Sequence, residues 1–201
     1  MASKVDICNL ALTRLATARI TSLSDGTVSA KDCNAIYELV AEQVMGLGPW
    51  PSCIRRVELA ALASTPEYEY TYEYTLPTNP RCLRIISINE SKPGEINYDI
   101  ENGKLLIDES TVKIKYIAYL SDSNSYDIYL RQAIVDHLVA ELIYTKTGSL
   151  SAFQAALSYA TQHAQELLSQ ASIQTNAKDI NSDVYIDARN SAWPDEGRLR
   201  D

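Results

Sequence analysis

The chain has 201 residues, which is enough for one well-filled core or for a core with a small appendage. A hydrophobic share of 46% and a charged share of 22% are ordinary for a globular protein, and they exclude a fibrous or wholly disordered chain. The formal net charge is −8, and no long segment has a basic balance. We therefore expect no surface that grips the phosphates of duplex DNA.

Two helices are expected in the N-terminal part of the chain. The first covers residues 4–18, because Ser3 and Asp6 have the spacing of a capping box and apolar side chains follow at helical spacing. The second covers residues 29–45, and the glycines and prolines of residues 46–51 end it. Each helix is expected to bury one apolar face.

The spacing of apolar residues then changes from the helical period to a period of two. Tyrosines alternate with Glu and Thr over residues 68–76, which predicts a half-buried strand. Asn102-Gly103 between two apolar segments is typical of a hairpin turn. The other strands are expected at residues 82–88, 98–100, 105–107 and 112–118. The tyrosine strand is expected to face a core or a neighbouring subunit, rather than to stack sugars or bases.

Helical periodicity returns at residues 126–146 and continues, after a short turn, to about residue 173. Apolar residues cover about half the circumference of the first of these helices, which indicates burial on more than one side. The second helix has a continuous apolar stripe, and its opposite face is polar and nearly uncharged. The residues of that polar face are Gln154, Ser158, Gln162 and Gln165. The face is expected either to pack against a neighbouring subunit or to be an ordinary solvated face.

Residues 176–201 form a C-terminal tail in which periodicity ends and Asn, Asp and Ser dominate. Large side chains nevertheless recur in it, and a segment that needed only solubility would lack them. Together with one basic residue they form a candidate docking set, namely Val184, Tyr185, Ile186, Arg189 and Trp193. We expect the tail to dock on a partner, and the alternative is a tail folded back on its own domain.

Few residues are suited to catalysis or metal binding. The four cysteines lack C-x-x-C spacing, so buried reduced thiols are expected rather than a zinc site. His137 and Glu141 are one helical turn apart, but two ligands are too few for a metal, and a buried polar pair is expected. His163 is expected at the edge of the apolar stripe without a special role. No phosphate-loop or nucleophile motif is present, so we predict no cofactor, no metal and no enzymatic activity.

Five segments of the sequence, taken together and in chain order, carry a resemblance to a known protein family. They are residues 6–15, residues 20–25, Pro49-Trp50 with Arg55, Arg56 and Leu59 after it, residues 74–77 followed by 82–84, and Leu130, Ala133, Leu138, Ala140, Glu141 and Leu142. Over about residues 4–172 they resemble the tail tubular protein A family, the head-to-tail adaptors of short-tailed, podovirus-type bacteriophages. Gly48 stands where the family often has a histidine, and the tail has no counterpart in it.

The resemblance implies a structural protein of the virion, made in the host cytoplasm, that forms a homo-oligomeric ring of about twelve copies between portal and tail. Its partners would be the portal protein, other tail components such as the nozzle or tail tube, and DNA that passes through the channel without sequence-specific binding. One alternative is a head-completion or neck protein of a long-tailed phage. The other is a glycan-degrading tail enzyme that uses the acidic turn at Asp108 and Glu109.

The fold expected from these elements is α+β. Residues 1–63 and 123–175 are expected to form a four-helix bundle. Residues 64–122 are expected to form a small antiparallel β domain inserted between the helical halves, and residues 176–201 the extended tail.

Overall fold

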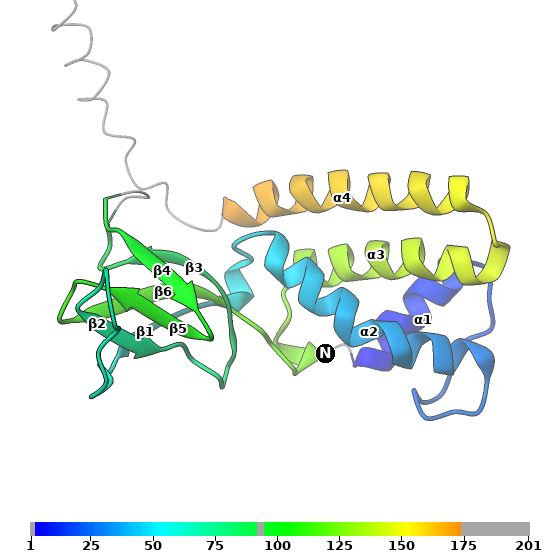
Figure 1. Ribbon diagram of the computed structural model, residues 1–201. Helices are drawn as coiled ribbons and strands as arrows, with labels where there is room; N and C mark the ends of the chain where they lie inside the picture. The colour runs from blue at the N-terminus through cyan, green and yellow to red at the C-terminus, as the bar shows by residue number, and fades with distance from the viewer. Residues whose placement is uncertain (1–2, 92–94, 174–201) are drawn as a thin grey trace, which may run out of the picture.

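A computed structural model describes residues 3–91 and 95–173. This part of the chain is α+β, with four α-helices at one end of the molecule and two small antiparallel sheets at the other (Figure 1). In chain order the elements are α1 (Lys4–Arg14), α2 (Val28–Leu47), the 3-10 turn η1 (Pro51–Cys53), β1 (Ile54–Leu59), β2 (Tyr72–Thr75), β3 (Cys82–Ile88), β4 (Tyr98–Glu101), β5 (Lys104–Ile107), β6 (Val112–Ala118), η2 (Ser123–Ser125), α3 (Ile128–Thr147) and α4 (Leu150–Ser172). The predicted C-terminal tail lies outside the described residues.

Each helix begins at a short polar side chain that accepts a hydrogen bond from a backbone N–H of the first turn. These N-caps are Ser3, Thr27, Asp127 and Ser149. The predicted capping box of Ser3 and Asp6 is confirmed. The first helix ends at Arg14, before the predicted residue 18, because Ala16 has a φ of 52° and leaves the helical conformation. Gly148 ends α3 with a φ of 64°, where glycine has no steric penalty.

Helix α3 is the shared neighbour of the other three helices. Its residues 133–138 are all buried, so the prediction that this helix is covered on more than one side is confirmed. Helix α4 packs along α3, and Figure 1 shows it along the upper edge of the molecule. Leu168 of α4 also reaches Gly48 after α2, where a Cβ atom would lie 2.6 Å from Leu168 Cδ1. The missing side chain at residue 48 therefore lets α4 approach the end of α2.

The strands form two three-stranded sheets of order β1-β6-β3 and β2-β5-β4. The predicted hairpin is confirmed, since β4 and β5 are joined by Asn102 and Gly103 with φ of 48° and 72°, the two positive values of a type I′ turn. Apolar side chains of both sheets form one core: Tyr74, Ile85, Ile88, Leu105, Ile107, Val112, Ile114, Tyr116 and Ala118. The prediction of a set of short antiparallel strands is therefore confirmed.

Strand β6 contributes to two cores. Ile114 and Tyr116 face the core between the sheets, whereas Ile117, on the opposite face of the strand, lies in the core that the helices share. Because successive side chains of a strand point to opposite faces, one strand can fill both cores. Trp50, just before η1, is fully buried in the helical core and donates a hydrogen bond from Nε1 to the Val44 carbonyl at 2.8 Å.

Two segments differ from the sequence expectation. Residues 54–59, expected within the helical part, form strand β1, which pairs antiparallel with β6. The tyrosine strand expected at 68–76 is ordered as a strand only over Tyr72–Thr75, because Glu69 has a φ of 68° and breaks the extended run. Glu73, which alternates with the tyrosines, is buried; Lys104 Nζ lies 2.9 Å from its Oε2 and the Ser64 hydroxyl donates to its Oε1.

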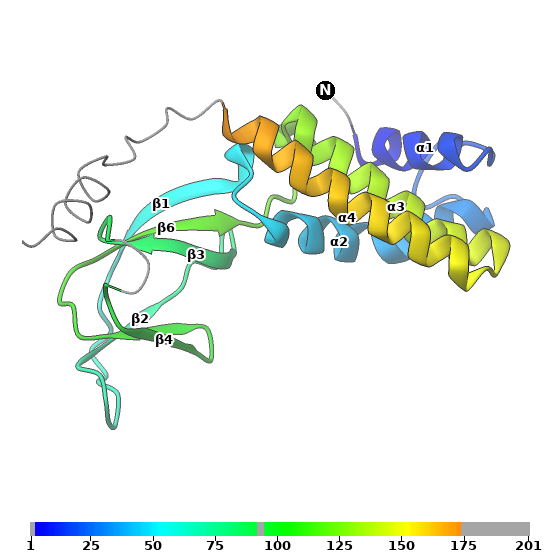
Figure 2. The same ribbon diagram turned by 90° about the horizontal axis from the view of Figure 1, so that it is seen from above.

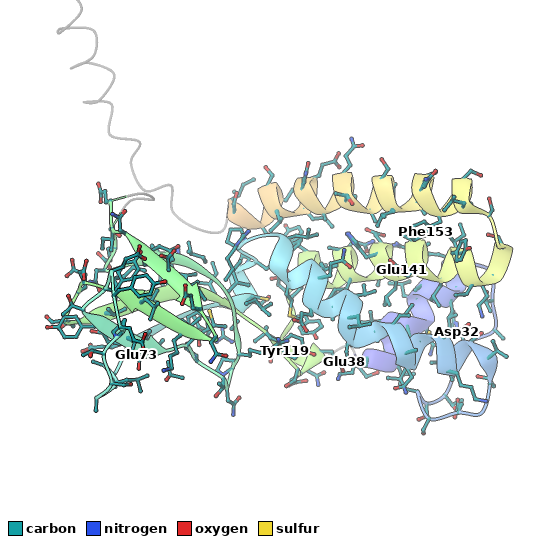
Figure 3. The ribbon with its side chains drawn as sticks, in the orientation of Figure 1. Asp32, Glu38, Glu73, Tyr119, Glu141 and Phe153 are labelled. Carbon is teal, nitrogen blue, oxygen red and sulfur yellow. The ribbon has the colours of Figure 1, made fainter. Side chains whose placement is uncertain are left out.

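Glu38 of α2 connects three segments where helices and sheets meet (Figure 3). It accepts hydrogen bonds from Lys4 Nζ of α1 and from the Tyr119 hydroxyl that follows β6. Partial burial raises the pKa of the Glu38 carboxyl, but these two hydrogen bonds outweigh that effect, and the net pKa is lowered from its usual 4.5. A depressed pKa in the folded state means that this stabilisation is present above pH 4.5 and is lost as the pH falls through the folded pKa.

We expect the substitution Glu38→Gln to reduce the acid dependence of the unfolding free energy. Denaturant unfolding at a series of pH values between 7 and about 3 measures this, because the wild-type protein should lose stability more steeply than the variant below pH 4.5. Glu67→Gln, at an exposed residue between β1 and β2, is the control and should keep the wild-type slope. If the unfolding free energies of the wild type and Glu38→Gln fell equally steeply below pH 4.5, the role given to Glu38 would be contradicted.

Candidate functional site

The outer face of α4 is the most extended candidate surface of the described residues. Gln154, Ser158, Gln162 and Gln165, the residues singled out from the sequence, are all exposed on it. Helix α4 has 23 residues and is thus about 34 Å long, and Glu166 is its single acidic residue, with no lysine or arginine. Amide and hydroxyl groups are easier to remove from water than charges, so this face can be covered by another molecule at a low desolvation cost.

Large apolar side chains are exposed on the same helix. Leu150 and Tyr159 are 59% and 61% exposed, and Ile173 lies just beyond the last helical residue with 81% of its surface exposed. Near the turn between α3 and α4, Phe153 packs edge-on against Tyr144, with ring centroids 6.0 Å apart. Interfaces are depleted in charged residues and rich in aromatic anchors, so the composition of this helix surface is that of a docking surface.

A buried polar cluster holds α1, α3 and α4 together. Asp136 of α3 is buried, and its carboxylate accepts hydrogen bonds from Arg14 of α1, from Gln132 at 3.0 Å, and from His163 Nδ1 of α4 at 2.8 Å. His163 was expected at the edge of the apolar stripe without a special role, and in the structure it has Asp136 as a hydrogen-bond partner. The Tyr159 ring lies beside it, with 5.5 Å between the ring centroids. The cluster combines the Arg14–Asp136 ion pair with hydrogen bonds to Asp136, and through His163 it attaches α4 to the other helices.

The predicted polar pair of His137 and Glu141 is not formed as a hydrogen bond. His137 is buried, and its Nδ1–H donates to the Ala133 carbonyl at 2.9 Å, within its own helix. Glu141 is half-buried on the same helix (Figure 3). In residues 3–91 and 95–173 there is no group of three or more His, Cys, Asp or Glu side chains with the geometry of a metal site.

The acidic turn considered for catalysis has a structural contact. Asp108 is exposed, and its Oδ1 accepts hydrogen bonds from the Thr71 N–H and hydroxyl, both at 2.9 Å, so it ties the start of β2 to the end of β5. Glu109 is also exposed, and its backbone carbonyl accepts the Tyr74 hydroxyl at 2.7 Å. Both carboxylates are exposed to solvent, whereas a catalytic acid usually lies in an apolar pocket.

The cysteines are free thiols; three of them are buried, as predicted, and Cys82 is only half-buried. They are Cys8, Cys33, Cys53 and Cys82. Burial raises the pKa of the Cys53 thiol to about 12, which makes it a poor nucleophile. The predicted docking residues of the tail lie outside the described residues; they are Val184, Tyr185, Ile186, Arg189 and Trp193.

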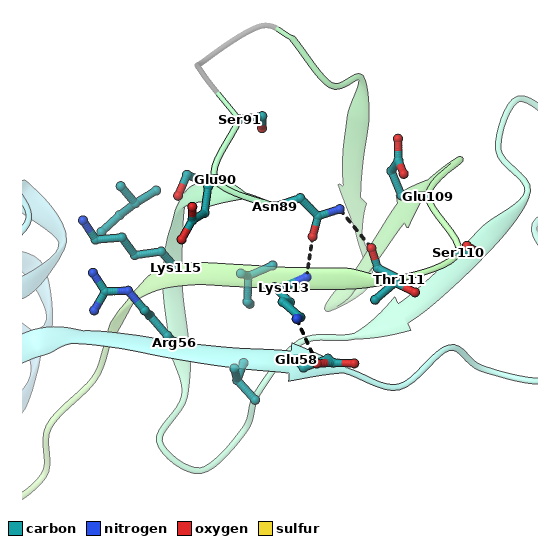
Figure 4. Close-up of a pocket in the computed structure, with 14 residues that line it drawn as sticks. Arg56, Glu58, Asn89, Glu90, Ser91, Glu109, Ser110, Thr111, Lys113 and Lys115 are labelled. Atoms are coloured by element: carbon teal, nitrogen blue, oxygen red, sulfur yellow. Dashed lines mark hydrogen bonds and ion pairs between the residues drawn. The ribbon is translucent and has the colours of Figure 1, made fainter. Parts of the chain in front are cut away.

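A second candidate surface is a hollow of about 1050 Å³ on the sheet β1-β6-β3, which the sequence did not indicate (Figure 4). Arg56 of β1 and Lys113 and Lys115 of β6 line it, together with polar residues of the segments that follow β3 and β5. Asn89 closes one side, since its amide donates to the Thr111 carbonyl and its Oδ1 accepts the Lys113 N–H. Three cationic side chains thus lie on one face of a protein that is acidic overall.

No protein-family model matches the chain, and none of the curated proteins matches it. Within the part of the chain that the structure describes, none of the helices combines the length and apolar character needed to cross a membrane.

Proposed function

We propose that the protein is a structural adaptor, a ring subunit that joins the portal to the tail of a short-tailed bacteriophage. The observation that carries this proposal is the outer face of α4, which is long, exposed, almost uncharged and accompanied by exposed Leu150, Tyr159 and Ile173. A ring subunit needs such a surface, because every copy presents one face to each neighbour. The sequence resemblance to head-to-tail adaptors supports the same role.

In this proposal the four helices act as a bundle that builds the ring. One face of α4 is held on α3 by Ala160, Ala164 and Leu167, and the Asp136 cluster fixes its position, so the opposite face is presented on a rigid element. The tail would dock on the neighbouring subunit or the portal through Val184, Tyr185, Ile186, Arg189 and Trp193. The net charge of −8 would let DNA pass through the channel without adhering to it.

Electron microscopy and native mass measurement of the isolated protein, and of its mixture with a purified portal ring, test the proposal. A closed ring of this chain on the portal is the expected result. Monomers that stay separate from the portal under both conditions would overturn it. A ring that forms without affinity for the portal would instead favour a neck protein, the alternative role.

The double substitution Ser158→Arg/Gln162→Arg should prevent this assembly and leave the subunit folded. Both side chains are exposed on α4, so thermal unfolding of the monomer should change little, whereas like charges facing a neighbouring copy oppose contact. We expect the assembled fraction to fall about tenfold or more, since two desolvated charges oppose each contact. Gln43→Arg, an equally exposed change on α2, is the matched control and should assemble normally. Normal assembly of the double variant would show that this face is not the contact.

A further inference from the structure

The outer face of the sheet β1-β6-β3 is divided into two parts. At the end near the helices, Ile117 is covered by the helical core. Farther along β6 the outward side chains are Lys115 and Lys113, which the register places opposite Arg56 and Glu58 of β1. This uncovered part is the floor of the hollow, and it is polar on both strands (Figure 4).

Arg56 and Lys115 are the unusual pair on this floor. They are directly opposite one another across the strands, and like charges in that position repel. Lys113 is neutralised by Glu58, whose Oε2 lies 3.6 Å from its Nζ. Among the ion pairs of the described residues, neither Arg56 nor Lys115 has an acidic partner, although Glu90 and Glu109 line the rim of the hollow. An additional carboxylate placed between these two cations would turn their repulsion into attraction.

Strand β1 supplies a backbone site next to these cations. It is an edge strand that pairs only with β6 in the described sheets, so its outer edge presents peptide groups that an extended segment can pair with. Figure 2 shows β1 along the outside of its sheet, on the side to which the C-terminal end of α4 points. An extended acidic segment would therefore find both backbone and charged partners at this edge.

The chain contains such a segment beyond α4. Residues 179–187 include Asp179, Asp183 and Asp187 and no lysine or arginine, and the intervening Val184, Tyr185 and Ile186 have high strand propensity. The ten residues from 174 to 183 span at most about 33–36 Å when extended, and α4 ends at the side of the molecule where the sheets lie (Figure 1). The segment therefore begins on the side of the sheets and has the charge to match the cations of the hollow.

We propose that residues 179–187 dock in the hollow of the sheet β1-β6-β3, along the edge of β1, with aspartate carboxylates between Arg56 and Lys115. Asp183 and Asp187 fall on the same face of an extended segment as Tyr185, whereas Val184 and Ile186 face the other way. The proposal concerns this segment whichever copy of the chain supplies it, and it does not depend on the adaptor role.

Carbodiimide cross-linking of the full-length protein, read by peptide mass spectrometry, tests this directly because the reagent joins lysine amines to carboxylates in contact. We expect links between Lys115 and Asp183 or Asp187. Arg56→Gln removes one of the two cations proposed to hold the aspartates. Because the reagent does not couple arginine, the substitution removes no group that could be cross-linked. It should therefore lower the yield of those links about fivefold. Arg19→Gln, at an exposed arginine between α1 and α2, is the matched control and should leave the yield unchanged.

Two results would overturn the proposal. One is that tail carboxylates link to Lys31, exposed on α2, as often as to Lys115, which would mean that the contacts are random. The other is that a short DNA duplex binds the protein and Arg56→Gln abolishes that binding, which would make phosphate the ligand of the hollow. Because the assay needs no portal, its outcome is separate from that of the assembly test: a protein that stays monomeric with the portal but retains these links would refute the adaptor role and support this inference.

Discussion

Replacement of Trp50 by alanine is expected to lower the free energy of unfolding by about 3–5 kcal/mol, the range for large aromatic residues in cores. Trp50 is 0% exposed and is among the largest fully buried side chains. It lies between the end of α2 and the start of β1, so a cavity there would loosen the helical core next to the first sheet. Its Nε1 also donates to the Val44 carbonyl, which would lose that partner. Urea or guanidinium unfolding measures the loss.

Two companion variants separate the contributions of Trp50. Trp50→Phe retains most of the packing and removes the indole N–H, so it should cost less, about 1–2 kcal/mol. Leu39→Ala, at a side chain that is 71% exposed on α2, should change stability by no more than about 0.5 kcal/mol. If Trp50→Ala were as mild as Leu39→Ala, the helical core would not depend on Trp50.

The substitution Asp136→Asn should destabilise the protein by about 2–4 kcal/mol, even though the side chain keeps its shape. The carboxylate is buried and accepts hydrogen bonds from Arg14, Gln132 and His163. The neutral amide retains one acceptor oxygen and presents an NH₂ group where a donor already points, so buried donors lose their partner. Chemical unfolding at pH 7 measures the effect, and Glu109→Gln, at an exposed carboxylate, should be close to neutral.

A double-mutant cycle assigns the effect to the cluster. Arg14→Met keeps the aliphatic stem and removes the guanidinium that reaches Asp136. In Asp136→Asn that charge partner is already lost, so the two changes together should cost less than the sum of the single changes by about 1 kcal/mol or more. Strict additivity would mean that Arg14 and Asp136 do not act as a pair.

Local sequence patterns predicted the helices and the central strands because their causes are local. The capping box at Ser3 and the Asn102-Gly103 turn each depend on a few adjacent residues. Strand β1 was missed, because Arg55, Arg56 and Glu58 give residues 54–59 the appearance of a polar connection. As an edge strand it has only β6 as a neighbour, so its exposed side chains leave little apolar pattern in the sequence.

The sequence predicted the exposed face of α4 but not the Asp136 cluster, again because only local patterns can be recognised in a sequence. The exposed face of α4 could be read from helical periodicity, and its residues lie where expected, although their packing against a neighbour stays a prediction. The Asp136 cluster joins residues 122 and 27 positions apart, so no spacing reveals it. The one sequence signal was an aspartate inside the apolar run of α3, which had to find partners from other elements.

The chain enters and leaves the sheet region through two adjacent strands. Ile54 at the start of β1 is paired with Ile117 near the end of β6, so the segment between them begins and ends at nearly the same point. The entropy of closing such a loop changes slowly with its length. Residues 60–111 can therefore change in length at a small entropic cost, but not freely in sequence, because Leu83 and Ile86 pack on the helical core and Arg81 forms an ion pair with Glu42 of α2. An insertion in a sheet loop away from these three contacts is thus expected to leave the helical core intact.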